Sequence, residues 1–386
     1  MFTKNKTLWI ALGAVLLTAA FYGIYLGWIK HDMSDFGVCY KNGRRILDGE
    51  TLYRISDGHL QFKYAPISAL FYASLALLPW EVAKIIWYYL ELILLFSVLW
   101  ISYKLLPSPR RGPVLVLLPA TLVLLKFIGR ELELGQVNIL ILFILILMIA
   151  EVIRRKDATA GVLWGISLFF KPYALVFLPY FILKKRFKIV LAGGAVVLAG
   201  LLLPALNFGF QGNWIVLREW VSTLSHSTPE LMAAGDTSSL YAFLWKVLPG
   251  HPDLWIKILW LVAGLAVGLL FLGMMRQGKK LALEVPEVLE TSFLMILIPL
   301  FSPLGWFYNY LYSVLAIILL IQALPKFPPL WKYALIADLI IIGATLREVL
   351  GKDLFHFYTR KSLVVVNYLI VLAALAYARW DRKTGL

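Results

Sequence analysis

Asp35 is the residue of this sequence whose type and position best suit chemistry. It lies a few residues after an apolar stretch, Leu8 to Ile29, that is long enough to cross a bilayer. A carboxylate just outside the membrane, in the first loop of a protein with many spans, can act as a base on a substrate carried by a lipid. A plain cap or loop residue is the structural alternative, and Asp32 is the rival acid three residues earlier.

The residues after Asp35 predict the element that positions it. Apolar residues recur at helical spacing, and polar side chains take the other face, namely Lys41, Asn42, Arg44, Arg45 and Asp48. Gly49 is placed to end this helix. The pattern predicts an amphipathic helix that lies on the outer face of the membrane. Asp35 is at the N-terminus of this helix, where the helix dipole favours a carboxylate.

The composition indicates a polytopic membrane protein. The 386 residues are 61% hydrophobic and 15% charged, with a mean hydropathy of +0.80, whereas soluble domains are about 25% charged. The net charge of +15 comes from short basic clusters between apolar runs, as in topology signals, so nucleic acid is not an expected partner. The single cysteine, Cys39, excludes an intramolecular disulfide and a Cys-based metal site, and neither a metal nor another cofactor is expected.

The basic clusters also predict the topology, because they favour the cytoplasmic side. Lys4 and Lys6 place the N-terminus inside, so the first loop, residues 30–80, lies outside. Tyr64–Pro79 is expected to form an interfacial or re-entrant helix within this loop, since a crossing would force the next basic cluster outside.

The remaining apolar runs predict an all-α protein with roughly twelve membrane segments. Residues 1–386 form a single integral membrane domain with both termini cytoplasmic. Residues 161–183 must start and end inside, which predicts two short helices that meet at Lys171 and Pro172. Residues 129–135 are expected to form an outside turn, and residues 207–253 a long outer loop that serves as a lid or acceptor site.

Polar residues near the outer ends of spans are the next candidates, because they are costly at membrane depth and mark functional sites. Arg130 belongs to the charged run of the outside turn, and Gln136 and Asn138 lie inside the start of the following apolar span. The alternative role of the two amides is hydrogen bonding between packed helices.

Lys171 is the clearest anomaly, because it stands alone between two apolar runs. A lysine binds phosphate as a compact charge, and Pro172 at the start of the second half-helix adds the anion affinity of a helix N-terminus. Snorkelling of the ammonium to the membrane interface is the alternative.

The turn Ser302–Tyr310 is rich in aromatic residues, including Trp306 and Tyr308, and holds Asn309. Aromatic faces stack on sugar rings, and the amide can hydrogen-bond hydroxyl groups. An aromatic belt at the membrane interface is the alternative explanation.

Taken in order, these residues resemble glycosyltransferase family 87 over most of the chain. The motifs that carry the resemblance are Asp35…Val38…Tyr40, Gly49…Leu52-Tyr53, Tyr64-x-Pro66, Gly135-Gln136-x-Asn138, Gly161…Gly165…Lys171-Pro172, Ser238-Ser239-Leu240 and Ser302-Pro303-x-x-Trp306. This resemblance implies a membrane enzyme of GT-C fold, in a family that includes the polyprenyl-phosphate-mannose-dependent mannosyltransferases of bacteria.

The resemblance implies that Asp35 is the general base on an acceptor hydroxyl, that the donor is a polyprenyl-phosphate sugar, and that the anomeric centre is inverted. Lys171, with Arg130 second, is the candidate for the donor phosphate. The candidates for sugar or acceptor binding are Gln136, Asn138, Tyr64, Ser239, Trp306, Tyr308 and Asn309. The chain departs from the family at Phe307, Tyr308 and Asn309, where the family often has an acidic residue and histidines, and at Ala65, where it often has a second proline.

The predicted function is the transfer of a sugar, mannose by resemblance, to a lipid-linked or glycan acceptor at the outer face of the plasma membrane. Donor, acceptor and membrane lipids are the expected partners. A transporter or flippase of lipid-linked sugars is the alternative, followed by another lipid-phosphate enzyme. The clustering of polar residues at one surface, without a visible internal repeat, favours the enzyme.

Overall fold

The computed structural model describes residues 2–231, 235–280, 285–302 and 304–381. Pro303 and residues 382–386, which the sequence motifs and the topology include, lie outside the described residues. Within them the chain forms helices and no β-strand, in the order α1 (Phe2–Gly27), α2 (Ser34–Leu47), α3 (Pro66–Ala76), α4 (Trp80–Leu105), α5 (Pro113–Leu134), α6 (Asn138–Ile153), α7 (Asp157–Phe170), α8 (Phe177–Leu183), α9 (Phe187–Leu202), α10 (Ala205–Leu231), α11 (Leu240–Val247), α12 (Asp253–Lys280), α13 (Pro286–Phe301), α14 (Val314–Ala323), α15 (Pro329–Ala344), α16 (Arg347–Arg360) and α17 (Val364–Trp380). Short 3-10 helices link several of them, including η3 (Pro172–Val176) and η4 (Phe307–Ser313).

The lengths and composition of these helices are those of an integral membrane protein. Among the described residues, four helical stretches are long and apolar enough to cross a bilayer: α4, α5, residues 253–277 of α12, and Phe307–Lys326. Two bent pairs, α9 with α10 and α16 with α17, raise the number to six if each pair is one span. The expectation of an all-α membrane protein is therefore confirmed, whereas the figure of about twelve segments also counts apolar helices shorter than a span.

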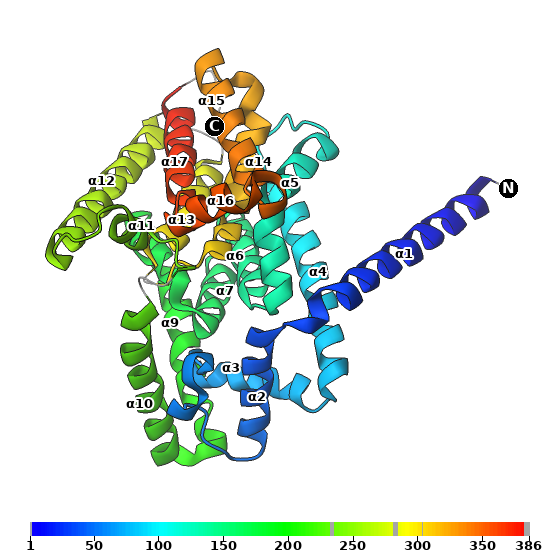
Figure 1. The fold of residues 1–386 in the computed structure, drawn as a ribbon, viewed down its shortest axis with the longest axis vertical. Helices are drawn as coiled ribbons and strands as arrows, with labels where there is room; N and C mark the ends of the chain where they lie inside the picture. The colour runs from blue at the N-terminus through cyan, green and yellow to red at the C-terminus, as the bar shows by residue number, and fades with distance from the viewer. Residues whose placement is uncertain (1, 232–234, 281–284, 303, 382–386) are drawn as a thin grey trace.

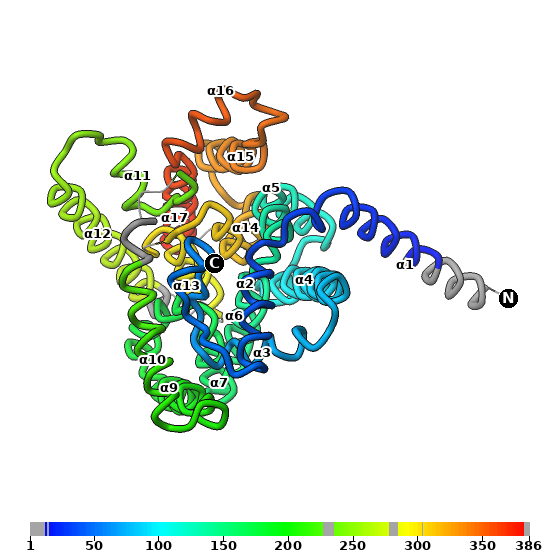
Figure 2. The backbone as a smooth tube through the Cα atoms, turned by 60° about the horizontal axis from the view of Figure 1, so that its bottom comes forward, coloured from blue at the N-terminus to red at the C-terminus, as the bar shows by residue number. Residues whose placement is uncertain are grey.

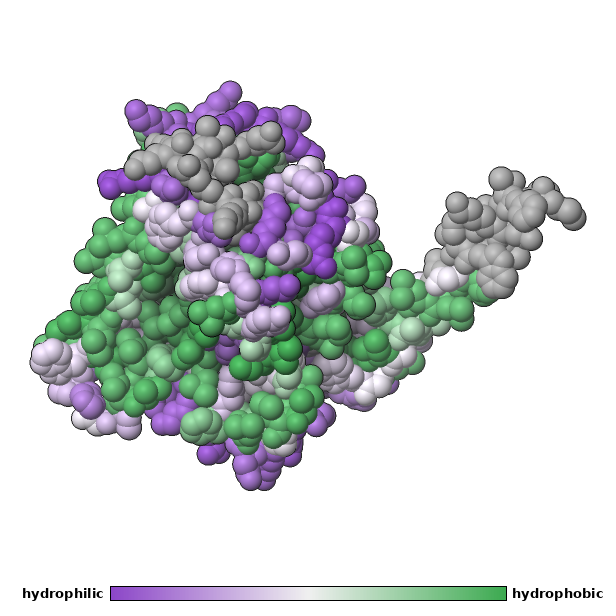
Figure 3. Space-filling model, turned by 90° about the horizontal axis from the view of Figure 1, so that it is seen from above, coloured by the Kyte–Doolittle hydropathy of each residue, from purple (hydrophilic) through white to green (hydrophobic). Residues whose placement is uncertain are grey.

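Helices α13 and α14 lie in the centre of the helical body, and α12 and α10 lie at its flank (Figures 1 and 2). Nearly every side chain of α14 is buried, whereas α12 exposes large apolar residues such as Leu254, Leu261 and Leu265. Helix α1 projects away from the body in both views. Exposed apolar flanks are what lipid-facing helices present. The space-filling view shows broad hydrophobic areas between hydrophilic side chains, which concentrate along the upper edge and form smaller patches along the lower edge (Figure 3).

The pair α7 and α9 is packed unusually closely because glycines face each other. A Cβ on Gly161 would come within 2.4 Å of the Ile189 carbonyl oxygen, and one on Gly165 within 2.7 Å of the Gly193 oxygen. Small residues four apart allow such close approach of helices in membranes. Helix α7 ends at Phe170 and η3 begins at Pro172, which confirms the predicted break at Lys171.

The amphipathic helix predicted after Asp35 is α2, and Gly49 follows its end with a φ of 69°. One part of its predicted face is wrong: Asn42 and Arg45 are buried rather than exposed. The reason for Arg45 is that the chain after α2 folds back over that side, where Arg45 donates to the Leu52 carbonyl and to Asp57. Helix α3 packs on another side of α2, where Gly43 lies so close to Tyr72 that a Cβ would approach its carbonyl carbon to 2.6 Å. Helix α3 has 11 residues, which fits the expected interfacial or re-entrant segment because about 20 are needed to cross.

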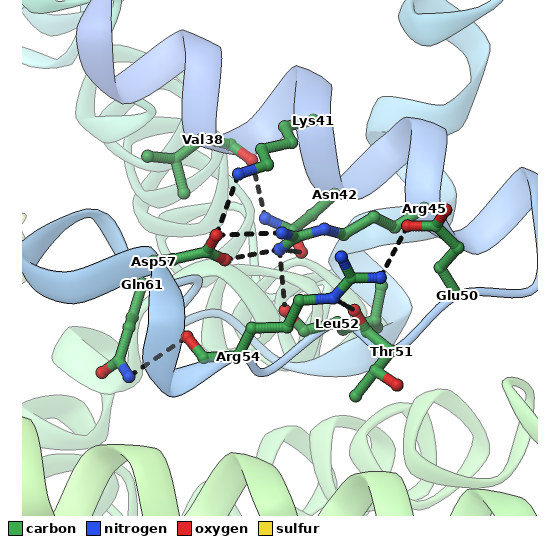
Figure 4. Close-up of polar contacts among 10 residues, drawn as sticks. All are labelled: Val38, Lys41, Asn42, Arg45, Glu50, Thr51, Leu52, Arg54, Asp57 and Gln61. Carbon is green, nitrogen blue, oxygen red and sulfur yellow. Dashed lines mark hydrogen bonds and ion pairs between the residues drawn. The ribbon is translucent and has the colours of Figure 1, made fainter.

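Arg45 is satisfied inside the first loop by an ion pair with Asp57 (Figure 4). The two guanidinium nitrogens donate to the two carboxylate oxygens at 2.5 and 2.9 Å, and Lys41 donates to the same carboxylate at 2.8 Å. Hydrogen bonds from Arg45 lower the pKa of Asp57 to about 2. This cluster fastens residues 50–63 to α2.

Two predicted loops are helical instead. Residues 129–134 of the expected outside turn are the last turns of α5, which ends at Gly135 in the left-handed conformation. Much of 207–253 belongs to α10 and α11, with a short start of α12. These segments carry polar residues among apolar ones, so a search for uniformly apolar spans does not detect them as helices.

Candidate active site

A cavity of about 1440 Å³ opens between α2, α5, the break after α7 and the aromatic turn before α14. Its wall includes Asp35, Tyr64, Arg130, Gln136, Lys171, Trp306 and Tyr308. Seven of the ten sequence candidates therefore face one space, although they come from segments up to 273 positions apart, from 35 to 308. Asn138 and Asn309 lie directly behind this wall, and Ser239 lies beside it.

The first turn of α2 holds Asp35, and main-chain contacts fix that turn. Met33, which precedes the helix, has a φ of 50°, and its N–H donates to the Glu133 carbonyl at 2.8 Å. Gly135 is also left-handed, and a Cβ there would lie 2.7 Å from the Cβ of Phe36. The start of α2 is thereby seated on the end of α5.

Gln136 connects Asp35 to the rest of the site. Its Nε2 donates to Asp35 Oδ2 at 2.5 Å and lies 3.1 Å from the Tyr308 hydroxyl. Burial raises the pKa of Asp35 above its ordinary value, while the charge of Lys171 and this hydrogen bond act in the opposite direction. A carboxylate whose pKa is raised is, in its ionised form, a stronger proton acceptor than a fully solvated one.

Lys171 lies on the other side of the same amide. Its ammonium donates to Gln136 Oε1 at 3.0 Å and to Asn138 Oδ1 at 2.9 Å. It also lies over the rings of Tyr64 and Tyr173, 5.9 and 5.6 Å from their centroids. These contacts point the ammonium into the site, so simple snorkelling to the interface does not account for Lys171.

A buried polar layer supports the wall from behind. Asn138 Nδ2 donates to Glu131 Oε1 at 2.6 Å and to Asn309 Oδ1 at 3.2 Å, and the Tyr312 hydroxyl donates to Asn138 Oδ1 at 3.2 Å. Asn309 in turn donates to the Tyr173 hydroxyl at 3.1 Å. Asn138 and Asn309 therefore orient Lys171 and Tyr173 rather than lining the cavity themselves.

Arg130 stands at the cavity mouth within an acidic cluster. Its guanidinium lies 2.6 Å from Glu133 and 3.5 Å from Asp32. The indole of Trp28 donates to Glu133 at 2.8 Å. Asp32 is thus engaged with Arg130, whereas Asp35 faces the amide and the ammonium.

Trp306 and Tyr308 stack on each other with nearly parallel rings, 6.4 Å apart between centroids. A short antiparallel bridge joins Trp306 to Thr237, and this bridge brings Ser238 to the cavity wall. Ser239 is the N-cap of α11, and its hydroxyl accepts from the Ala242 N–H at 3.2 Å. Of the serine pair, it is Ser238 that faces the cavity.

Several residues outside the ten sequence candidates also belong to the site. Tyr173, Tyr312 and Glu131 take part in the polar network, and Ser238, Asp236 and Lys126 line the cavity. Tyr173 follows Lys171 and Pro172 directly, and Ser238 stands in the serine motif, so proximity to the motifs was the available signal. Within the described ranges, no group of three His, Cys, Asp or Glu side chains is placed to hold a metal ion.

This arrangement offers a carboxylate, two cations and stacked aromatic rings around one large cavity, which suits a sugar carried on an anionic lipid. Residues 62–303 match the sequence pattern of glycosyltransferase family 87. The chain belongs to this family. It is therefore a glycosyltransferase, and the matched region includes Tyr64, Gln136, Asn138, Lys171 and Ser239, whereas Asp35 precedes it and Trp306 follows it.

The chain is also similar to an individual mannosyltransferase whose donor and acceptor are named. The chain is 25% identical over 336 residues to the polyprenol-phosphate-mannose-dependent alpha-(1-2)-phosphatidylinositol mannoside mannosyltransferase of Mycobacterium tuberculosis. The alignment covers 81% of this chain and 75% of the relative. No solved structure matches the chain.

Proposed function

We propose that this family 87 glycosyltransferase moves mannose from a polyprenyl-phosphate donor to a hydroxyl of a glycolipid acceptor. The transfer takes place at the outer face of the plasma membrane, with inversion, in a GT-C-type fold of about twelve membrane segments with both termini inside. The named activity of the mycobacterial relative supports the donor and the acceptor class. The observation that carries the chemistry is the contact of Gln136 with both Asp35 and Lys171 on the cavity wall.

Asp35 serves as the general base. The acceptor hydroxyl gives its proton to a carboxylate oxygen of Asp35 while its oxygen forms a bond to C1 of the donor sugar. The bond between C1 and the phosphate oxygen breaks at the same time, and polyprenyl phosphate leaves with the electron pair. A positioned base of this kind contributes about 10²–10⁴-fold to the rate.

Positive charge stabilises the departing phosphate, which needs no proton of its own because it is already a good leaving group. Arg130 and Lys171 both face the cavity and supply that charge. Lys171 is held by two amide oxygens rather than by a carboxylate, so its charge stays available for an incoming anion.

The remaining wall residues recognise the sugars. Trp306 and Tyr308 present ring faces for stacking, and Gln136 and Tyr64 present polar groups beside them. Asn138 and Asn309 act through Lys171 and Tyr173, and Ser239 acts through the turn that carries Ser238.

The test is a transfer assay with the purified protein in lipid nanodiscs. Polyprenyl-phosphate-mannose is supplied with a phosphatidylinositol mannoside acceptor, and the product is identified by mass spectrometry and its anomeric configuration by NMR. Polyprenyl-phosphate-glucose and a nucleotide-activated mannose are the controls. We expect product only with the lipid-linked mannose. Movement of labelled lipid-linked sugar across a sealed vesicle without any transfer would instead support the transporter alternative.

A further inference from the structure

Lys126 is a buried cation that the proposed chemistry does not use. It lies on α5 with 8% of its surface exposed and lines the cavity. Within the described part of the chain its Nζ has no hydrogen-bond partner. The rings of Phe127, Phe307 and Tyr358 surround it at 5.0, 5.4 and 5.4 Å. A buried ammonium without an anion is costly, so its position indicates a place where an anionic group arrives.

An apolar groove reaches the cavity at this point. The groove has a volume of about 550 Å³ and runs between α5 and α15, with Leu122, Ile340 and Gly343 among its walls. Leu125 and Leu346 line both the groove and the cavity. Leu125 directly precedes Lys126, so the unpaired cation stands where the apolar groove opens into the polar cavity.

We propose that this junction binds the donor lipid, with the polyprenyl chain in the groove and the phosphate on Lys126. This inference rests on the proposed function. Lys126 and Arg130 are four residues apart on one face of α5, about 6 Å along its axis. Both line the cavity. A phosphate between them has its chain directed toward the groove and its sugar directed toward Gln136.

The other cations of the site are less suited to capture the phosphate first. Arg130 is already paired with Glu133 and Asp32. Lys171 keeps its charge available for the transfer step, but it already donates to Gln136 and Asn138, whereas Lys126 has no hydrogen-bond partner among the described residues. The shape of the groove also favours the donor over the acceptor. The donor has a single polyprenyl chain, and its phosphate is bonded to the carbon that reacts, so one groove beside the reaction site accommodates it. A phosphatidylinositol glycolipid instead has two acyl chains, and its phosphate is separated from the hydroxyl that reacts.

The first experiment measures steady-state kinetics for Lys126→Met and Lys126→Arg in nanodiscs. Methionine keeps the apolar length and suits the aromatic surroundings, so the fold is retained. We expect Lys126→Met to raise the KM for polyprenyl-phosphate-mannose about tenfold, because a hydrogen bond to a charged group is lost. The KM for the acceptor stays unchanged, and Lys126→Arg restores much of the donor affinity. Lys104→Met is the matched control, since Lys104 also lies over an aromatic ring but is exposed and outside the cavity.

The second experiment fills the groove. Ile340 lines it and is 61% exposed, whereas the adjacent Ile341 is 49% exposed and does not line it. Ile340→Trp is expected to raise the donor KM, and Ile341→Trp to leave it unchanged. A photoreactive polyprenyl phosphate without a sugar should crosslink to α5 and α15 in the wild-type protein, and much less in Lys126→Met.

The outcomes separate the two proposals. Transfer with an unchanged donor KM in Lys126→Met, or equal effects of the two tryptophans, overturns the junction while leaving the proposed function intact. A rise in the acceptor KM instead assigns the junction to the acceptor and overturns the inference as stated. Crosslinking at the junction without any mannosyl transfer upholds the lipid-phosphate site and removes the proposed function. Absence of both crosslinking and transfer removes both.

Discussion

Gln136 donates a hydrogen bond to Asp35 with its amide nitrogen and accepts one from Lys171 with its amide oxygen. One side chain therefore orients a carboxylate and an ammonium that lie 136 positions apart in the sequence, at 35 and 171. Because both ends of the amide are occupied, its orientation is fixed. In the proposed reaction this geometry keeps the base and a stabilising charge in constant relation while substrates exchange.

Asp35→Asn tests the proposed base. Asparagine keeps the shape and can still accept from Gln136, but it cannot take a proton. We expect transfer to fall by about 10²-fold or more with unchanged expression and thermal stability. Asp32→Asn is the matched control, and we expect it to retain most of the transfer activity. Asp32 is the neighbouring acid, but it accepts from the Ser34 N–H and pairs with Arg130 instead of contacting Gln136. Normal turnover by Asp35→Asn would remove this residue from the mechanism.

Lys171→Met tests the electrostatic link between the two charged groups. The pKa of Asp35 is raised by burial, and the charge of Lys171 limits that rise. Activity needs the ionised carboxylate and is lost as the pH falls through this pKa. Removing the ammonium raises the pKa further, so the acidic limb of the pH–rate profile should move to higher pH, and the donor KM should rise. An acidic limb at the wild-type position, with Lys104→Met as control, would contradict the link.

Gly135→Ala tests the seat of α2. A left-handed alanine costs about 1–2 kcal/mol, and here the new Cβ would also meet Phe36 at 2.7 Å. Gly49→Ala has a similar φ but meets nothing within 4 Å. We expect Gly49→Ala to lower the melting temperature slightly and to leave activity intact, whereas Gly135→Ala should lower both. Equal behaviour of the two variants would show that the contact with Phe36 does not matter.

The ion pair of Arg45 and Asp57 predicts how the first loop responds to acid. The pKa of Asp57 is lowered to about 2, mainly by hydrogen bonds from Arg45. Its stabilisation is therefore fully present above about pH 4 and is lost as the pH falls through about 2. Pepsin should cleave residues 50–63 faster at about pH 2 than at about pH 4.

Asp57→Asn should make that cleavage fast at both pH values, because Arg45 is left buried without its partner. Asp48→Asn is the control, since Asp48 and Arg44 form an exposed pair. If the wild-type loop were cleaved equally at both pH values, the ion pair would not hold it.

Local signals predicted the elements that carry the site, but not all of their contacts. The proline after Lys171 and the glycine at position 49 mark helix boundaries through backbone chemistry that neighbouring residues alone determine. Gln136 and Asn138 were recognisable as polar residues in an apolar span. Which side chains they meet depends on how α2, α6 and α7 pack, and single-sequence patterns do not encode that packing.

The incorrect predictions for individual residues have the same cause, namely packing between segments that the sequence pattern does not encode. Arg45 looked exposed because α2 is amphipathic, yet the chain that follows the helix folds back and places Leu52 and Asp57 against it. Ser239 and Ser238 are equivalent in sequence, and only the start of α11 decides which hydroxyl caps the helix. Lys126 was one basic residue near the end of an apolar run, and only the three-dimensional structure shows that it has no hydrogen-bond partner among the described residues.

The glycine contact between α7 and α9 bears on how the site is held while substrates exchange. The close approach of the two helices at Gly161 and Gly165 leaves little room between them, so Lys171, directly after α7, stands on a stiff support. Asp35 lies in the first turn of α2, which the main-chain contact at Met33 seats on the end of α5. Because Gln136 bonds to both side chains, the ammonium is the fixed point of reference from which the position of the carboxylate is set.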